Sequence, residues 1–393
     1  MSRKIIYRIQ NIVLSQKDKF IKLARDIWAH PELGLEEKFA CAIQVELLQK
    51  LGFEVETPYG GLDTAYKAVS GNKGPAFCFV AEYDALPGIG HGCGHNLICS
   101  AAIAAGWALL SVIKNIGIDG TVVVMGTPAE ESKGGKIIML ENNILDGIDT
   151  VIMAHPFWQT LESTDSNAIR RFDISFKGKA SHAAAAPELG LNALDAVISV
   201  FNGVNAWRQH LPEKARIHGI IIDGGKAPNI IPDYAKCRFF LRAPEEPLLN
   251  IMEKRFKNIT AGAALITGTS YEIENFGRSY KSNKSNKTLN KLFVTVASEL
   301  GMKPTTSQYT SRGSSDFGDF SHVKPGIHPY FGIAEKELAL HSYEFAKAAN
   351  SDYAMEQMLK AATAMAVIGY EYISDKSFRE EIVQENNETK LLN

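Results

Sequence analysis

Apolar residues in the first part of the chain follow a helical spacing and then fall into short continuous runs. Between residues 15 and 51 they recur every three to four positions, with an interruption at His30-Pro31, because proline disfavours helix in the residue before it. This segment predicts two helices joined by a turn. Segment 97–113 is long, apolar and rich in alanine, which is typical of a buried helix.

Short apolar runs predict strands at 64–69, 76–81, 121–125 and 150–154, and a helix at 134–142 separates the last two. Strands that alternate with helices favour a three-layer α/β domain. The polar residues that follow these strands would then gather at the carboxyl edge of the sheet, where open α/β sheets bind their ligands.

The pattern changes near residue 170. Strands are predicted at 172–177, 216–223, 235–241 and 270–276, with helices at 191–210 and 245–265, in the β-α-β-β-α-β order of a ferredoxin-like module. Later segments predict helices at 289–300 and 351–372, a strand at 329–333 and a polar tail from residue 380. We therefore predict that residues 169–279 are inserted into a first domain made of residues 1–168 and 280–393.

Length and composition agree with two domains of an ordinary globular protein. The 393 residues exceed what one compact core usually holds. The net charge of -2 and the 22% of charged residues give no electrostatic footprint for nucleic acid or for an anionic membrane, so neither is expected as a partner. Polar residues interrupt the apolar N-terminus, and the five cysteines are scattered, which indicates reduced thiols and a cytoplasmic location.

The glycine-rich loop 88–96 carries the first candidate chemistry. Cys93 and His95 lie two residues apart, and a thiolate and an imidazole at this spacing can hold one divalent metal ion. A small buried cysteine in a glycine turn and a hydrogen-bonded core histidine are the alternatives. His91 has the same local setting and is interpreted as structural.

Carboxylates follow two of the predicted strands. Glu130 and Glu131 are adjacent, so their side chains point in different directions and can serve different roles; a solvated first turn of a helix is the alternative. Asp84 can accept a hydrogen bond from a ligand imidazole or cap a turn. Glu82 receives no role from the sequence.

Two further histidines complete the candidate site. His155 follows the apolar run 151–154 and precedes Pro156, which places it at the carboxyl edge of the predicted sheet. His341 lies far downstream in a less informative context. His328, in the turn 326–329, is the alternative ligand.

Several motifs together make the chain similar to the M20 family of metallopeptidases and amidohydrolases. They cover nearly the whole chain: Ala85-Leu-Pro87, the loop 92–96, residues 127–131, 153–156, 178–183, 228–232 and 315–317. The Cys-x-His form resembles the amidohydrolase branch, and Asn96 together with residues 326–331 resembles its subgroup of aminobenzoyl-glutamate hydrolases, β-alanyl-lysine-type dipeptidases and a staphylococcal methicillin-resistance auxiliary amidohydrolase. Asn96 departs from the hippurate-type enzymes, so their substrate range is not transferred.

The resemblance implies a three-layer α/β metallopeptidase domain with an inserted ferredoxin-like lid or dimerisation domain, and a homodimer or larger homo-oligomer. It also implies two divalent metal ions, with zinc favoured and manganese or cobalt as alternatives. The implied ligands are Cys93, His95, Glu131, His155 and His341. Glu130 would be the general base for a metal-bridged hydroxide.

Three residues of the inserted domain gain roles from the same resemblance. His182 would stabilise the oxyanion, in some members within the partner subunit's site; a helix-entry residue is the alternative. Asn229 and Arg242 would hold a substrate carboxylate, and a charged residue at the end of an edge strand is the alternative for Arg242.

The predicted reaction is metal-dependent hydrolysis of the amide bond in a small dipeptide-like or N-acyl-amino-acid substrate. Three other functions stay open at this point. They are a non-catalytic metal- or peptide-binding protein on the same scaffold, a broader peptidase acting on short peptides, and a thiol hydrolase with Cys93 as its nucleophile.

Overall fold

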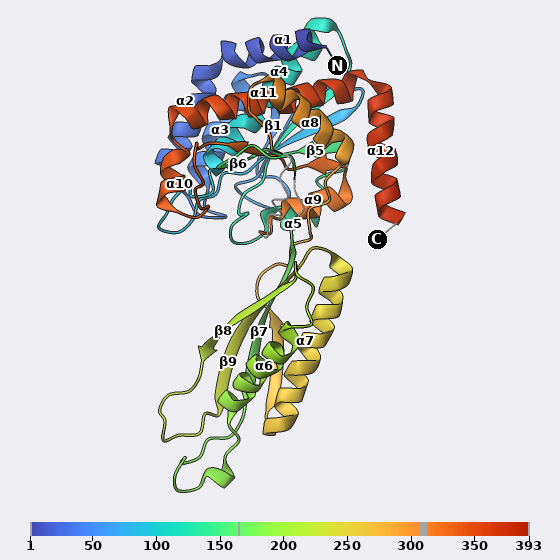
Figure 1. Ribbon diagram of the computed structural model, residues 1–393. Helices are drawn as coiled ribbons and strands as arrows, with labels where there is room; N and C mark the ends of the chain where they lie inside the picture. Colours follow the sequence, from blue (N-terminus) through green and yellow to red (C-terminus); the bar gives the residue numbers. More distant parts are fainter. Residues whose placement is uncertain (1, 164–165, 306–312, 392–393) are drawn as a thin grey trace. The chain divides into compact units, whose positions relative to one another are not determined.

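A computed structural model describes residues 2–163, 166–305 and 313–391 (Figure 1). The chain divides into two compact units. Unit 1 comprises Met1–Asp165, Asn283–Thr310 and Ser315–Asn393, and unit 2 comprises Ser166–Ser282 and Ser311–Ser314. The second segment of unit 2 lies outside the predicted insertion 169–279. Its described end joins unit 2 through hydrogen bonds from the Asn167 amide to the Gly313 carbonyl and from Arg242 to the Ser314 hydroxyl.

Unit 1 is built on a mixed sheet in the order β1-β2-β4-β3-β5-β11. Neighbours among β4, β3, β5 and β11 are parallel, whereas β1 and β2 are antiparallel to their neighbours. The strand bounds are β1 (Glu54–Glu56), β2 (Tyr66–Ser70), β3 (Ala76–Ala81), β4 (Thr121–Gly126), β5 (Thr150–Ile152) and β11 (Gly326–Ile327). A separate parallel pair joins β6 (His155–Phe157) to β12 (Tyr330–Gly332).

Helices cover both faces of this sheet, because successive side chains of a strand point to opposite faces. On β3, Phe77 and Phe79 pack into one hydrophobic cluster, and Cys78 and Val80 pack into another. The helices of unit 1 are α1 (Arg3–Ser15), α2 (Lys17–Ala29), α3 (Lys38–Lys50), α4 (His95–Ile116), α5 (Gly135–Leu140), α8 (Lys287–Glu299), α9 (Phe317–Val323), α10 (Tyr343–Ala348), α11 (Asp352–Ser374) and α12 (Lys376–Leu391). The predicted three-layer α/β architecture is thus confirmed.

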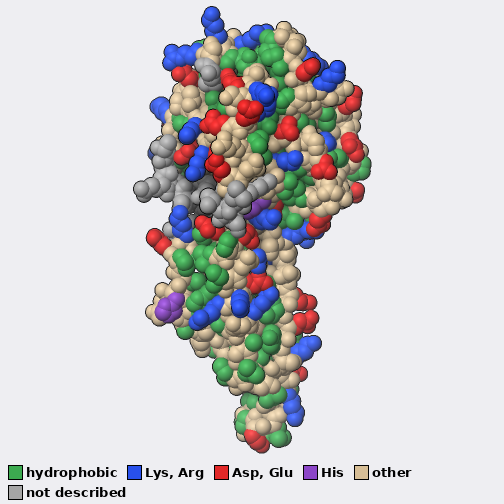
Figure 2. All heavy atoms as spheres, turned by 90° about the vertical axis from the view of Figure 1, so that its right-hand side faces the viewer, with side chains coloured by type: hydrophobic (Ala, Val, Ile, Leu, Met, Phe, Trp, Pro, Cys, Tyr) green, Lys and Arg blue, Asp and Glu red, His purple; other side chains and the backbone are tan. Residues whose placement is uncertain are grey.

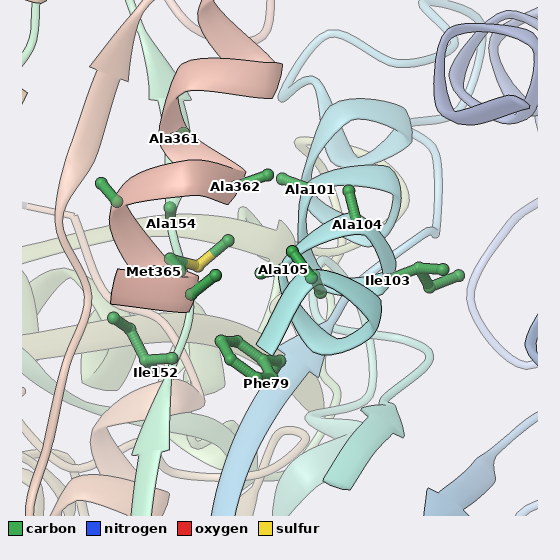
Figure 3. Packing of buried hydrophobic residues seen from close by; sticks show 14 of the residues in the cluster. Phe79, Ala101, Ile103, Ala104, Ala105, Ile152, Ala154, Ala361, Ala362 and Met365 are labelled. Carbon is green, nitrogen blue, oxygen red and sulfur yellow. The ribbon is translucent and has the colours of Figure 1, made fainter. Parts of the chain in front are cut away.

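The central helix of unit 1 is α4, which packs against α11 and the sheet. Small residues line the contact, and Ala101 of α4 faces Ala362 of α11 (Figure 3). Among the described helices, α4 alone is long and apolar enough to cross a membrane, but 89% of its apolar window is buried inside the protein. A core helix has the same composition, so α4 is explained by its packing.

Unit 2 has the ferredoxin-like topology expected from the sequence. Its antiparallel sheet has the order β10-β7-β9-β8, and α6 and α7 bury one face of it. The bounds are β7 (Ala168–Lys177), α6 (Ala193–Arg208), β8 (Arg216–Asp223), β9 (Tyr234–Ala243), α7 (Glu246–Thr267) and β10 (Ser270–Asn275).

Several elements differ from the sequence-based expectations. The two helices expected between residues 15 and 51 correspond to α2 and α3. Helix α1, with its buried Ile6, Ile9 and Val13, precedes them and has no counterpart in the sequence-based expectation. The strand expected at 150–154 ends at Ile152, and His155 opens β6. Strands β1 and β11 and helices α9 and α10 are too short for a periodic signal.

Charged side chains of both signs are interspersed over the face of unit 1 seen in Figure 2. This distribution agrees with the small net charge of the chain.

Candidate metal centre

Most of the candidate residues lie just beyond the carboxyl ends of the parallel strands. Asp84 follows β3, Glu130 and Glu131 follow β4, and His155 follows β5. Parallel strands end at the same edge of a sheet, so segments far apart in sequence meet there. Asp84 and Glu131 touch directly, since the Glu131 amide donates to Asp84 Oδ2 at 2.9 Å.

The loop between β3 and α4 delivers Cys93 and His95 to the same edge. Gly94 between them has φ +73°, and a Cβ there would lie 2.6 Å from Pro156 Cγ, so the position requires glycine. Helix α4 begins at His95, two residues earlier than the sequence suggests. The thiol and the imidazole are both buried in unit 1.

Among the residues that the structure describes, three overlapping groups can each hold a metal ion, with ligand atoms all within 4.8 Å of one another. The first contains Cys93, His95 and His155, and the second contains Cys93, Glu131 and His341. Cys93 belongs to both, so its sulfur is placed to be shared between two ions. The third group joins His95 to Glu130 and Glu131.

The distances within these groups are those of ligands around a cation. Cys93 Sγ lies 3.6 Å from His155 Nε2 and 3.6 Å from His341 Nε2. His341 Nε2 lies 3.5 Å from Glu131 Oε2. Two ligands of one tetrahedral zinc ion are separated by about 3.6 Å for a sulfur and a nitrogen and about 3.4 Å for a nitrogen and an oxygen. The geometry therefore fits a cation between these atoms.

Hydrogen bonds to the far ring nitrogens orient two of the histidines. His95 Nδ1 lies 3.0 Å from Asp84 Oδ1, and His155 Nδ1 lies 2.7 Å from the Pro156 carbonyl oxygen. An acceptor at Nδ1 holds the proton there and leaves the Nε2 lone pair free. Within the described parts of the chain, His95 Nε2 and Glu131 Oε1 are buried without a hydrogen-bond partner. A metal ion would satisfy both, so these residues fit one.

Electrostatics in the protein alone do not favour a thiolate at Cys93. Burial, together with the charge of Glu131, raises the pKa of the Cys93 thiol well above its usual value. Burial lowers the pKa of His95, but hydrogen bonds to Asp84 and Cys93 outweigh it, and the pKa of His95 is raised well above 6.5. A bound cation would reverse both preferences, because a coordinated thiol loses its proton.

Glu130 is a buried carboxyl group beside other acids. Burial raises its pKa well above the usual value, and the charges of Glu131 and Glu82 add to the rise. A carboxyl group with a raised pKa can both accept and return a proton near neutral pH. Glu130 thus has the environment of a general base.

His341 and His328, the two candidates for the last metal ligand, differ in whether they lie near the other ligands. His341 has φ +61°, and its amide donates to the Gly92 carbonyl, which brings its ring to Cys93 and Glu131. His328 is buried with Nε2 unpartnered in the described structure, but none of the three metal-holding groups includes it. His91 is also buried, with Nε2 3.1 Å from the Ile27 carbonyl oxygen, and stays outside these groups.

The candidates from the inserted domain all lie in unit 2. His182 is exposed and forms an isolated β-bridge with Ile230, which follows the exposed Asn229. This bridge lies beyond the paired ends of β7 and β9, at Lys177 and Tyr234. Arg242 lies at the other end of β9, so unit 2 keeps Arg242 apart from His182 and Asn229. Burial and the nearby Arg171 lower the pKa of Arg242, whose guanidinium donates to Ser314.

Several buried polar residues near the site have no role in the sequence analysis. Glu82, Lys136 and Asp316 form buried ion pairs, and Glu37 accepts a hydrogen bond from the Ala129 amide. In the sequence, the one signal of such a buried charge is Lys136, a lysine beside the apolar residues of the predicted helix 134–142.

Comparison with known proteins identifies the family of the chain. Residues 78–368 match the model of peptidase family M20/M25/M40. The chain is 36% identical over 383 residues to Xaa-Arg dipeptidase of Mus musculus, covering 92% of this chain and 88% of the mouse protein. It is 33% identical over 323 residues to one component of the p-aminobenzoyl-glutamate hydrolase of Escherichia coli, covering 77% of this chain and 67% of that protein.

Solved structures share the fold at lower identity. A proposed aminohydrolase from methicillin-resistant Staphylococcus aureus superimposes with a TM-score of 0.79 and 21% identity, covering 93% of this chain and 99% of that one. The YXEP protein of Bacillus subtilis, described as a dinuclear metal-binding peptidase, superimposes with a TM-score of 0.69 and 21% identity. The match covers 91% of this chain and 99% of that one. The matched region takes in both units and the metal-holding groups, and the chain belongs to peptidase family M20/M25/M40.

Proposed function

We propose that this protein is a dinuclear metal-dependent amidohydrolase that cleaves the amide bond of a small dipeptide-like or N-acyl-amino-acid substrate. One observation carries the proposal: Cys93 belongs to two metal-holding groups at once, with His95 and His155 in one and Glu131 and His341 in the other. A shared ligand between two complete groups is the arrangement expected for a pair of ions.

The ligands of the first ion would be Cys93, His95 and His155, and those of the second would be Cys93, Glu131 and His341. When bound, the ions polarise the scissile carbonyl and lower the pKa of water. Zinc suits this mixture of sulfur, nitrogen and oxygen donors, and manganese and cobalt are the alternatives.

Glu130 is the residue that moves the proton in this proposal. Its carboxylate takes a proton from the attacking water and returns it to the nitrogen of the leaving amine, which must be protonated before it departs. The raised pKa of Glu130 favours holding that proton between the two steps. His182 would donate a hydrogen bond to the developing oxyanion.

The relatives support a substrate with an amide bond to an amino acid. Their names give an Xaa-Arg dipeptide for the mouse protein and p-aminobenzoyl-glutamate for the bacterial one. Both substrates place a free carboxylate beside the scissile amide, which Arg242 would bind. Asn229 precedes the other end of β9, so the same carboxylate would be within reach only of Asn229 of the partner subunit. A panel of dipeptides and N-acyl amino acids, tested with added zinc, manganese or cobalt, identifies the preferred member.

Glu130→Gln is the test of the mechanism. We expect hydrolysis to fall by about 10²–10⁴-fold, the range assigned to general acid–base catalysis, while metal content stays at the wild-type level. Activity assays and elemental analysis of the same purified variant measure both. Glu141→Gln, at an exposed acid, is the matched control. Persistent hydrolysis in Glu130→Gln would refute the assignment of the base.

A thiol hydrolase is disfavoured because the pKa of Cys93 is raised, whereas a nucleophilic cysteine needs a lowered pKa. Chelation separates the two mechanisms. We expect EDTA dialysis to abolish hydrolysis and added zinc, manganese or cobalt to restore it. A thiol enzyme would keep its activity in EDTA and lose it to alkylation alone.

A further inference from the structure

Two arginines of the unit 2 sheet lie on the face turned away from α6 and α7. The face under these helices carries the hydrophobic cluster, with Leu241 of β9 among its members. Because side chains alternate along a strand, Arg242 of β9 and Arg171 of β7 point to the other face. Their guanidinium groups donate to neutral partners. Arg171 bonds to the Arg278 carbonyl at 2.9 Å. Arg242 bonds to the Ser314 hydroxyl at 3.1 Å.

Other basic residues on the same face are paired with an acid. Arg238 Nε lies 2.6 Å from Asp173 Oδ1, and Lys236 Nζ lies 2.8 Å from Asp173 Oδ2. The one carboxylate therefore serves both of these cations. Within the described part of the chain, no acid forms an ion pair with Arg171 or Arg242, so their positive charge has no counter-ion there.

Arg171 and Arg242 are diagonal neighbours on two adjacent strands. Arg171 pairs in register with Phe240, and Arg242 lies two residues beyond Phe240 on the same face. Diagonal neighbours in a sheet are roughly 7–8 Å apart, which is within the reach of two arginine side chains. Burial lowers the pKa of Arg242, and the charge of Arg171 lowers it further, as expected for two cations close to each other.

Aromatic rings hold the Arg171 guanidinium in place. Its Cζ atom lies 4.5 Å from the centroid of the Tyr280 ring and 5.6 Å from that of the Phe240 ring. The backbone of Tyr280 pairs with Ile169, the residue opposite Arg242, so these contacts keep the guanidinium on the side of Arg242. Contact with a ring orients a guanidinium but does not neutralise its charge. Two partly buried cations side by side are unfavourable unless an anion joins them.

We propose that Arg171 and Arg242 form a subsite for two acidic groups, and that the preferred substrate releases an amino acid with a second carboxylate, of the glutamate or aspartate kind. The inference rests on the proposed function, in which Arg242 binds the carboxylate beside the scissile amide. Arg171 then binds the side-chain carboxylate through its planar fork of donors. A neutral side chain leaves Arg171 without a partner and a basic one is repelled, so Arg171 determines the specificity.

Alanyl-glutamate and alanyl-glutamine test this subsite, because they have nearly the same size and differ by one negative charge. Their binding is measured by calorimetry on the full metal-loaded chain with Glu130→Gln, in which cleavage is expected to stop, and their kcat and KM are measured on the unsubstituted chain. We expect the acidic dipeptide to bind at least about tenfold more tightly, the effect of one charged hydrogen bond. We also expect this preference to shrink as salt is added.

Arg171→Gln and Arg238→Gln are the matched variants for the same measurement. Each removes one positive charge from the same face of the sheet, but Arg238 is already paired with Asp173. We expect Arg171→Gln to lose most of the preference by weakening only the acidic dipeptide, and Arg238→Gln to keep it. Thermal unfolding checks that both variants are folded. If Arg171→Gln is not, the charge preference of the unsubstituted chain and its salt dependence decide the test.

Equal affinity for the two dipeptides would overturn the proposal, and so would a preference that survives in Arg171→Gln. Equal weakening of both dipeptides by Arg171→Gln would mean that the two arginines hold a single carboxylate, which also refutes the second acidic group. Failure of the proposed function looks different. A metal-loaded chain that hydrolyses neither dipeptide nor any N-acyl amino acid contradicts that function, whereas a chain that hydrolyses both dipeptides equally well contradicts only the role of Arg171.

Discussion

Glu37 holds the segment that carries the two site carboxylates. It is fully buried, its Oε1 accepts a hydrogen bond of 2.8 Å from the Ala129 amide, and its Oε2 accepts one of 3.0 Å from the Thr64 hydroxyl. Ala129 has φ +62° and immediately precedes Glu130. Glu37 therefore fixes an unusual backbone conformation next to the proposed general base.

The pH dependence of stability follows from the same residue. Burial raises the pKa of Glu37 to about 7, and the charge of Asp84 adds to the rise. The folded state therefore binds the Glu37 proton more tightly than the unfolded state does. This contribution is fully present below the unfolded pKa of about 4.5 and is lost as pH rises through about 7.

Glu37→Gln tests this prediction, since glutamine stays neutral and can still accept from Ala129. We expect the free energy of unfolding of wild type to fall relative to the variant as pH rises from 5 to 8, by about 3 kcal/mol at most. Urea unfolding of both proteins across this range measures it. A difference between the two proteins that is independent of pH would mean that Glu37 has an ordinary pKa.

Packing at the level of elements is tightest around α4. Gly106 of α4 faces the sheet, and a Cβ there would lie 2.4 Å from Val124 Cγ2 of β4. Gly262 of α7 in unit 2 has nothing within 4 Å of the same position. Both glycines are inside long helices, so helix propensity alone would favour alanine equally at the two sites.

The two substitutions should therefore act in opposite directions. We expect Gly262→Ala to stabilise the protein by about 0.5–1 kcal/mol, and Gly106→Ala to destabilise it by about 1–3 kcal/mol because its methyl group overpacks the contact with β4. Thermal or urea unfolding of the two variants measures the difference. Equal stabilisation by both would show that α4 can move away from the sheet at little cost.

On the scale of the whole molecule, the predicted homodimer gives each metal centre two candidate copies of unit 2, one from its own chain and one from the partner subunit. His182 follows Lys177, the last residue of β7. The chain enters the unit 2 sheet at the opposite end of β7, at Ala168, and leaves it at Asn275 of β10, which pairs with Phe172. The predicted homodimer allows His182 to act in the partner's centre.

Mixing two inactive variants, Glu130→Gln and His182→Ala, distinguishes the arrangements after exchange of protomers. If His182 acts in the partner's centre, each mixed dimer regains one intact centre, and we expect about a quarter of the wild-type activity from an equimolar mixture. If His182 acts within its own chain, the mixture stays inactive. Size-exclusion chromatography with light scattering measures the oligomeric state, and a monomer would contradict the dimer prediction.

The sequence by itself determined the family, the alternation of elements in both units, and the positions of the metal-ligand candidates at strand ends. These features are local: an apolar run such as 76–81 becomes β3 at those residues, and a Cys-x-His loop is visible within three positions. Only the tertiary structure decided that His341, 248 residues from Cys93, meets its sulfur while His328 does not.

The tertiary structure also revealed the burial and the partners of Glu37, Glu82 and Lys136. Each depends on a partner far along the chain, such as Asp316 for Lys136, 180 residues away, and on burial that no local pattern encodes. A charged residue in a sequence is most simply interpreted as solvated. Only folding, which removes water from that residue and sets a distant partner against it, decides whether it is structural or part of a site.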